Sequence, residues 1–173
     1  MLVAITGTPG TGKSSACEVL SRKGFQIIDL NELAEEKGLV RHLKKRDSPG
    51  IVDINRLKRI KLPGDDTVFI YSHFAHYINS DMVIVLRCDP RTLETRLKAR
   101  GWKKTKIREN IEAEAIDLIT VEAMENCDRV YEIDTTSYNA DKTAHQILDI
   151  VKGKVTGHEP GKINWSEDIL SWY

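Results

Sequence analysis

A run of eight residues near the start of the chain has the composition and spacing of a phosphate-binding loop. Residues Gly7–Ser14 read GTPGTGKS and match the pattern GxxxxGK[ST] at every fixed position. Glycines let the backbone turn tightly enough for several N–H groups to face one phosphate chain, and the N-terminus of a following helix adds positive charge. The Lys13 ammonium can then reach the β- and γ-phosphates, and the Ser14 hydroxyl can ligate Mg²⁺. The pattern predicts a site for a nucleoside triphosphate with its Mg²⁺.

The residues on either side of this loop fit the structure that the pattern requires. The apolar run Leu2–Thr6 is typical of a buried strand, and Ser15–Leu20 is typical of a helix. The alternative is a glycine-rich turn that precedes a helix by chance, but such a turn does not explain the adjacent lysine and serine. We therefore interpret Gly7–Ser14 as a phosphate loop.

Apolar runs alternate with helical patterns along most of the chain. The expected strands are Leu2–Thr6, Phe25–Ile28, Thr67–Tyr71, Met82–Leu86 and Arg129–Ile133. The helices expected after the first one cover residues 31–38, 53–60, 91–100, 105–125 and 141–151. Continuously apolar runs indicate a parallel sheet that is covered on both faces. We predict an α/β fold of the P-loop NTPase class, with a five-stranded parallel sheet, helices on both faces and the ligand at the carboxyl ends of the strands.

The chain length fits a single domain of this kind. With 173 residues, we expect a domain over residues 1–152 and a C-terminal tail over residues 153–173 that packs on it. The chain has 26 basic and 26 acidic side chains, so its net charge gives no argument for a nucleic acid partner.

Cysteine usage and hydropathy indicate the compartment. The three cysteines, Cys17, Cys88 and Cys127, are odd in number and widely spaced, which favours buried thiols in a reducing environment. No leader precedes the first strand, and no apolar run approaches about 18 residues. We expect a cytoplasmic protein without a membrane partner.

Two stretches are insertions relative to a minimal fold of this class, one at about residues 30–60 and one at about residues 96–108. Nucleoside monophosphate kinases need two such excursions, one to hold the acceptor and one to close over the transferring phosphoryl group and exclude water. Arg96 and Arg100 lie one helical turn apart beside Gly101, so both guanidinium groups can face one phosphate chain. A solvated basic face is the alternative for either arginine alone. Beside a phosphate loop, the pair favours a nucleoside-monophosphate-kinase type of fold with a short lid.

Four motifs can be compared with known families: Gly7–Ser15, Val83–Asp89, Arg96–Trp102 and Lys106–Glu114. Together they resemble the adenylate kinase isoenzyme 6 family, the coilin-interacting nuclear ATPases of eukaryotes and their archaeal counterparts. The combination Arg-Leu-x-x-Arg-Gly-aromatic with Asn-Ile-x-x-Glu separates this family from ordinary adenylate kinases. The resemblance covers most of the first 125 residues.

The loop, the arginine pair and the resemblance together predict the residues of the site. The expected ATP-binding residues are Gly10, Thr11, Gly12, Lys13, Ser14, Ser15, Arg96 and Arg100. By the resemblance, Arg100 is the lid arginine on ATP, residues 30–53 bind the monophosphate and residues 99–109 form the lid. Lys13, Arg100 and His73 are the expected catalytic residues, and Ser14 is the expected metal ligand.

The resemblance also implies activities and partners. It implies adenylate kinase activity on ATP and AMP or another nucleoside monophosphate, ATPase activity, and a role in small ribosomal subunit maturation with a platform ribosomal protein and small-subunit rRNA. The alternative is an ATP-switched assembly factor with little true AMP kinase activity. The basic connection Arg41–Arg46 and the aromatic tail with Trp165 and Trp172 are candidate partner surfaces, although a charged loop is more often only solvated.

The chain departs from the family pattern at two places. The family has an aspartate two residues before a histidine after the third strand, and this chain has Tyr71 there. A phenol cannot replace an anionic group near Mg²⁺, so Ser14, the phosphates and water must hold the ion, or another acid such as Asp29 or Asp89 takes part. In the monophosphate segment, Glu35 stands where the family has an arginine, which removes one basic contact.

His73 itself has two interpretations. A lone histidine after a strand is commonly structural, but this one follows the third strand at the expected position of the γ-phosphate. A catalytic or switching role is the competing hypothesis. His76 is expected to be structural.

Overall fold

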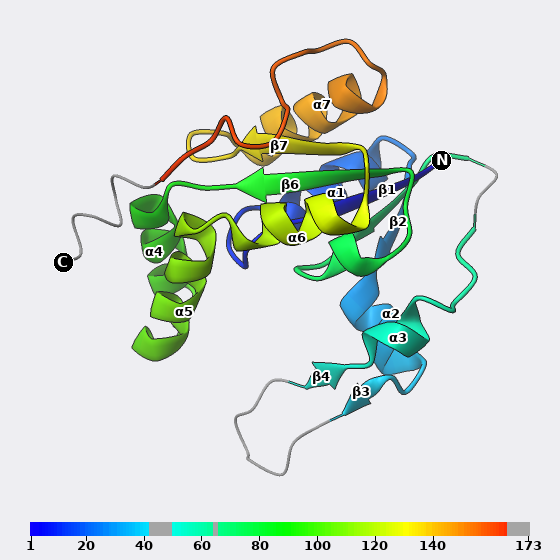
Figure 1. Cartoon of the computed structure of the whole chain (residues 1–173), viewed down its shortest axis with the longest axis horizontal. Coiled ribbons are helices and arrows are strands. Elements are labelled where there is room, and N and C mark those ends of the chain that lie inside the picture. Colours follow the sequence, from blue (N-terminus) through cyan, green and yellow to red (C-terminus); the bar gives the residue numbers. More distant parts are fainter. Residues whose placement is uncertain (42–49, 64–65, 166–173) are drawn as a thin grey trace.

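The computed structural model describes residues 1–41, 50–63 and 66–165. Its centre is a five-stranded parallel sheet with the order β2-β5-β1-β6-β7, which confirms the predicted fold (Figure 1). The strands are β1 (Leu2–Thr6), β2 (Gln26–Asp29), β5 (Val68–Tyr71), β6 (Met82–Arg87) and β7 (Val130–Asp134). Because β1 is central, the loop that follows it leaves the middle of the carboxyl edge.

Helices cover both faces of this sheet. On one face, α1 (Lys13–Arg22) and α7 (Ala140–Val151) pack over buried side chains that include Val3 and Ile5. On the other face, α6 (Leu118–Asn126) and the short 3-10 helix η1 (Ala75–Tyr77) pack over Ala4 and Val83. Alternate residues of β1 thus enter different core layers, which is why the strand is apolar throughout.

A helical hairpin projects beyond the carboxyl ends of the strands (Figure 1). Its helices are α4 (Pro90–Ala99) and α5 (Lys104–Ala115). Asp89 begins α4, because its carboxylate accepts a hydrogen bond from Thr92 N at 2.8 Å and Pro90 occupies the first turn, as predicted. The chain turns between the helices at Gly101, whose φ of 73° favours glycine.

A second projection lies between β2 and β5 in the sequence. Its elements are α2 (Leu30–Glu36), β3 (Val40–Arg41), β4 (Ile51–Val52) and α3 (Ile54–Leu57). The antiparallel β3–β4 pair was not predicted, because two-residue strands leave no periodic pattern. α3 ends before the predicted residue 60, because Arg59 N and Ile60 N bond to carbonyl oxygens three residues back, as in a turn, and not four residues back. Residues 42–46 of the basic connection lie outside the described residues.

The helix predicted for residues 105–125 is wrong as a single element. The chain forms α5 and α6, which are separated at Asp117, the described non-glycine residue with a left-handed φ of 56°. The Asp117 carboxylate pairs with the buried Arg87 guanidinium, and this ion pair favours the break. Helical periodicity continued across the break and therefore concealed it.

The described part of the C-terminal segment contacts β7. Glu132 N donates to His158 O at 2.7 Å, and Gly161 N donates to Glu132 Oε2 at 2.9 Å. Trp172 lies outside the described residues.

The three cysteines are free thiols, with Cys17 and Cys88 buried. Within the described ranges, no helix is both long enough and apolar enough to cross a membrane.

Candidate active site

The phosphate loop folds closely against its surroundings, and its glycines permit this. Gly7, Gly10 and Gly12 have φ values of 136°, 97° and 98°. A Cβ at Gly7 would lie 2.3 Å from the Leu86 carbonyl oxygen, and one at Gly10 would lie 2.8 Å from Leu93 Cδ1. The loop therefore needs glycine at these two positions in order to reach the end of β6 and the side of α4.

Lys13 lies inside the curve of this loop. Its ammonium donates hydrogen bonds to the carbonyl oxygens of Gly7 at 2.6 Å and Thr8 at 3.0 Å. Burial lowers the pKa of Lys13 to about 8, while the nearby Glu114 carboxylate acts in the opposite direction. A buried ammonium that donates to neutral carbonyl groups can gain much from a phosphate anion.

A cleft of about 450 Å³ opens over the loop and joins three parts of the fold. The loop and α1 contribute residues that include Gly10, Gly12, Lys13, Ser14 and Ser15. The sheet edge contributes Asp29, Tyr71, Ser72 and His73, and the helical hairpin contributes Arg100, Trp102, Lys106 and Asn110. The predicted residues Lys13, Ser14, His73 and Arg100 thus share one cleft. Trp102 and Lys106 belong to the predicted lid, whereas Asn110 had no predicted role.

The other two predicted residues, Thr11 and Arg96, line an adjoining cavity of about 180 Å³. Arg96 donates to the carbonyl oxygens of Thr135 at 2.8 Å and Thr136 at 3.0 Å, so its guanidinium joins α4 to the loop after β7. Arg100 is exposed and lines both cavities. The two arginines therefore reach the same site in different ways, one held by backbone groups and one accessible to a ligand.

Thr135 holds the phosphate loop to the sheet, and sequence reasoning missed it. Its hydroxyl oxygen lies 2.8 Å from the carbonyl oxygens of both Thr11 and Arg87. The hydroxyl is buried between the loop and the end of β6. A threonine after a strand has no pattern of its own, so only the fold reveals this contact.

Of the two acids considered for the metal, one lines the cleft. Asp29 pairs with Tyr71 in the β2–β5 register and lies with Ser14 along the cleft. Asp89 instead caps α4 through Thr92 N and does not line the cleft. Within the described part of the chain, no cluster of three or more His, Cys, Asp or Glu side chains could hold a metal ion.

His73 stands at the edge of the sheet in the same cleft. Its ring is exposed and packs edge-on against Phe74, with ring centroids 5.0 Å apart. Crowding by surrounding atoms and then the Lys13 charge lower the pKa of His73 to about 4, so the ring is neutral near pH 7. His76, in contrast, is buried between Thr6 Oγ1 at 3.0 Å and Glu122 Oε2 at 3.1 Å, which fits a structural residue.

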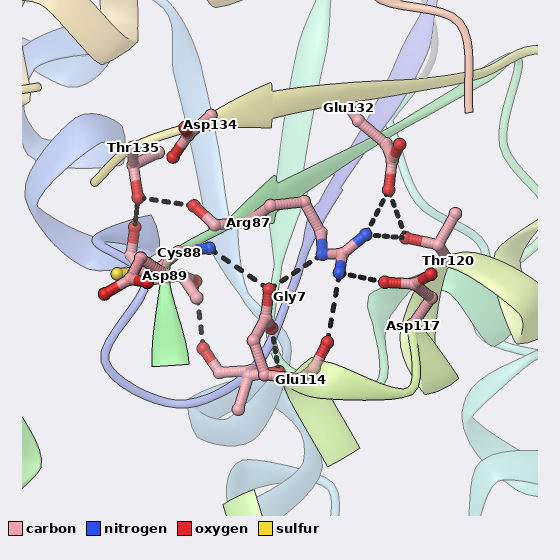
Figure 2. A network of polar contacts seen from close by, with 12 residues as sticks. Gly7, Arg87, Cys88, Asp89, Glu114, Asp117, Thr120, Glu132, Asp134 and Thr135 are labelled. Carbon is pink, nitrogen blue, oxygen red and sulfur yellow. Dashed lines mark hydrogen bonds and ion pairs between the residues drawn. The ribbon is translucent and has the colours of Figure 1, made fainter. Parts of the chain in front are cut away.

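A buried ionic network lies beneath the loop, as Figure 2 shows. Arg87, at the end of β6, donates through Nε to Glu114 Oε1 at 2.7 Å and pairs with the carboxylates of Asp117 and Glu132. Burial alone would lower the pKa of Arg87, but Glu114 and the other carboxylates outweigh it and raise the pKa. The sequence analysis included Glu114 in a motif but gave it no role. A charged residue within a buried element usually has an oppositely charged partner, so Glu114 could have been expected to form an ion pair.

Comparisons of the sequence with known proteins identify a matching family model and close relatives. A family model described as "AAA domain" matches residues 3–117. A protein of Archaeoglobus fulgidus named "Putative adenylate kinase" is 39% identical over 98% of this chain and 94% of its own. One of the same name from Methanosarcina acetivorans is 40% identical over 98% of this chain and all of its own.

Solved structures show the same fold in more distant proteins. Shikimate kinase from Acinetobacter baumannii has a TM-score of 0.61 at 15% identity and covers 90% of this chain and 95% of its own. Shikimate kinase from Bacteroides thetaiotaomicron has a TM-score of 0.57 at 14% identity, with coverage of 88% and 98%. By the family model and these relatives, the chain belongs to the AAA-domain family and to an adenylate-kinase-like family.

Proposed function

We propose that the protein transfers the γ-phosphoryl group of Mg·ATP to a nucleoside monophosphate, with AMP as the expected acceptor. One observation carries this proposal: three cavities lie in a row and share lining residues. The small cavity at Arg96 meets the phosphate cleft at Gly10 and Arg100. The phosphate cleft meets a cavity of about 440 Å³ at Asn31, Gly50 and His73. A donor nucleoside, its phosphates and an acceptor would occupy them in that order.

The third cavity lies against the projection that sequence analysis assigned to the monophosphate. It is lined by Glu35, Val52 and Ile54, together with residues shared with the phosphate cleft. His73 stands where the two cavities meet, which supports its proposed role in orienting the attacking oxygen. Glu35 in this cavity is an acceptor of hydrogen bonds, so it fits an amino group of the acceptor better than its phosphate.

Catalysis in this arrangement rests on positioning and charge. Lys13 would neutralise the β- and γ-phosphate oxygens, and the exposed Arg100 would stabilise charge on the group in transfer. Ser14 and Asp29 would hold Mg²⁺, which supplies further charge neutralisation. The hairpin residues Trp102 and Lys106 border the same cleft and would limit the access of water.

The experiment replaces Lys13 with alanine. We expect Lys13→Ala to lose turnover of ATP with AMP while its circular dichroism spectrum stays that of the wild type. Lys23→Ala, which changes an exposed lysine just after α1, is the matched control and should keep full activity. A folded Lys13→Ala variant with wild-type turnover would remove the phosphate loop from the reaction.

A second candidate function is an ATP-switched assembly factor of the small ribosomal subunit. The observation that favours a protein partner is a group of large apolar side chains on and beside α6: Ile116 is 60% exposed, Val121 50% and Met124 58%.

ATPase activity, membership of the isoenzyme 6 branch and a cytoplasmic location are proposals that rest on the resemblance and the sequence. ADP formation measured with AMP, and then with a small-subunit ribosomal protein, separates the two functions. A rate raised by AMP and indifferent to the protein favours the kinase.

A further inference from the structure

One buried carboxylate contacts both the phosphate loop and the sheet. Glu114 of α5 is 2% exposed. Its Oε2 accepts a hydrogen bond from Thr8 Oγ1 at 2.5 Å, although the two residues are 106 positions apart. Its Oε1 accepts from Arg87 Nε at 2.7 Å and from Cys88 N at 3.1 Å (Figure 2). The helical hairpin, the loop and the end of β6 therefore meet at a single side chain.

Arg87 keeps this carboxylate in place. Besides Nε, its Nη2 donates to the Glu114 carbonyl oxygen at 3.0 Å, so the guanidinium contacts both the side chain and the backbone of Glu114. The guanidinium also pairs with Glu132 and Asp117 and donates to Thr120 Oγ1 at 3.2 Å. When a buried charge has this many partners, the loss of any one of them costs free energy of folding. The position of Glu114 is therefore well defined.

Glu114 bonds to Thr8, and two other side chains of the loop also bond to Thr8. The Thr8 carbonyl oxygen accepts from Lys13 Nζ at 3.0 Å and from Thr11 Oγ1 at 2.9 Å. This peptide group therefore helps to position the Lys13 ammonium, together with the Gly7 carbonyl oxygen, which accepts from Nζ at 2.6 Å. Within the described part of the chain, the Thr8 hydroxyl is held from outside the loop by its hydrogen bond to Glu114.

We propose that Glu114 is a positioning residue for phosphoryl transfer: through Thr8 it fixes the first turn of the phosphate loop in the geometry that Lys13 needs. The proposal rests on the proposed function. A loop that is held before the nucleotide arrives does not have to reorganise during the reaction, and small displacements of such groups are costly.

The first test changes Thr8, because that leaves the buried ions in place. Thr8→Val keeps the shape and removes the hydroxyl, whereas Thr8→Ser keeps the hydroxyl. We expect Thr8→Val to lower kcat about tenfold, with the KM for AMP unchanged and the thermal midpoint within a few degrees of the wild type. Thr8→Ser should restore the rate. Wild-type kcat in Thr8→Val, or equal loss in both variants, would overturn the proposal.

The second test changes the carboxylate itself. Glu114→Gln keeps the volume but removes the charge and replaces one accepting oxygen with an amide group that donates. The double variant with Thr8→Val should be no slower than the slower single variant. Losses that multiply would mean that the two residues act independently, which would contradict the proposal. Glu112→Gln is the control, because Glu112 is exposed on the same helix and pairs with Arg108 at 2.7 Å.

A third readout separates this proposal from the proposed function. The dissociation constant of ATP, measured by calorimetry without any acceptor, should rise about tenfold in Thr8→Val and stay unchanged in Thr8→Ser and Glu112→Gln. This difference is expected even if the wild type phosphorylates no monophosphate. An ATP affinity that is equal in all variants would contradict the positioning role of Glu114 without contradicting the proposed function.

Discussion

Tyr71 and Asp29 occupy paired positions at the carboxyl ends of β5 and β2 and line the same cleft. Burial raises the pKa of Tyr71, and the neighbouring Asp29 carboxylate raises it further. The phenol thus stays protonated beside an acid that lines the cleft. Tyr71 replaces the acid of the family pattern in position, and its partner Asp29 can supply the charge.

Mg²⁺ dependence tests this relationship. Asp29→Asn should raise the Mg²⁺ concentration for half-maximal rate about tenfold or more, since losing an outer ligand typically has that effect. Asparagine caps helices as well as aspartate does, so the bond from Asn31 N that begins α2 is kept. Asp89→Asn is the control at a second capping acid. Equal Mg²⁺ titrations for Asp29→Asn and the wild type would exclude Asp29 from the metal site.

Arg100 should act on the reaction rather than on the fold. It is exposed and borders both the donor cavity and the phosphate cleft. We expect Arg100→Ala to lower kcat about a hundredfold, the usual effect of removing one group that stabilises transition-state charge, with unchanged urea unfolding. Lys98→Ala, two residues earlier on the same hairpin, removes an exposed pair with Glu94 and should leave kcat intact. An active Arg100→Ala variant would contradict the role of a lid arginine.

Thiol reactivity follows from burial. Burial raises the pKa of Cys17 and of Cys88 to about 12, so neither forms appreciable thiolate at pH 8. Cys127 is only half-buried. Brief treatment of the native protein with iodoacetamide at pH 8 should add one label, at Cys127, and treatment in denaturant should add three. Labelling of Cys17 or Cys88 in the native state would show that these sites open more readily than the structure indicates.

The neutral His73 ring predicts a pH dependence of stability. Its pKa is lowered from 6.5 to about 4, first by the atoms that crowd the ring and then by the Lys13 charge, so the unfolded chain binds more protons between these values. The free energy of unfolding should therefore fall as the pH drops through 6.5 towards 4. His73→Asn should lose less stability over this interval in paired urea titrations. Parallel curves for the two proteins would mean that His73 titrates normally.

Local patterns and distant contacts differed in how well the sequence predicted them. The strands could be predicted because most of their residues are apolar, as in β1 and β6. The phosphate loop could be predicted from its residue pattern, and the structure shows why that pattern needs glycine at Gly7 and Gly10, where a Cβ would meet neighbouring atoms. The break at Asp117 was missed, since it depends on an ion pair with Arg87. The Thr8–Glu114 bond was also missed, because no periodicity relates residues 106 positions apart.

The most direct test of the account measures nucleotides after ATP, AMP and Mg²⁺ are mixed with the protein. Chromatography at successive times should show two ADP formed for each ATP consumed, with little free phosphate, at a rate that falls strongly when AMP is left out. This result would show transfer between the donor and acceptor cavities. ADP formed one for one with free phosphate, at a rate independent of AMP, would contradict it.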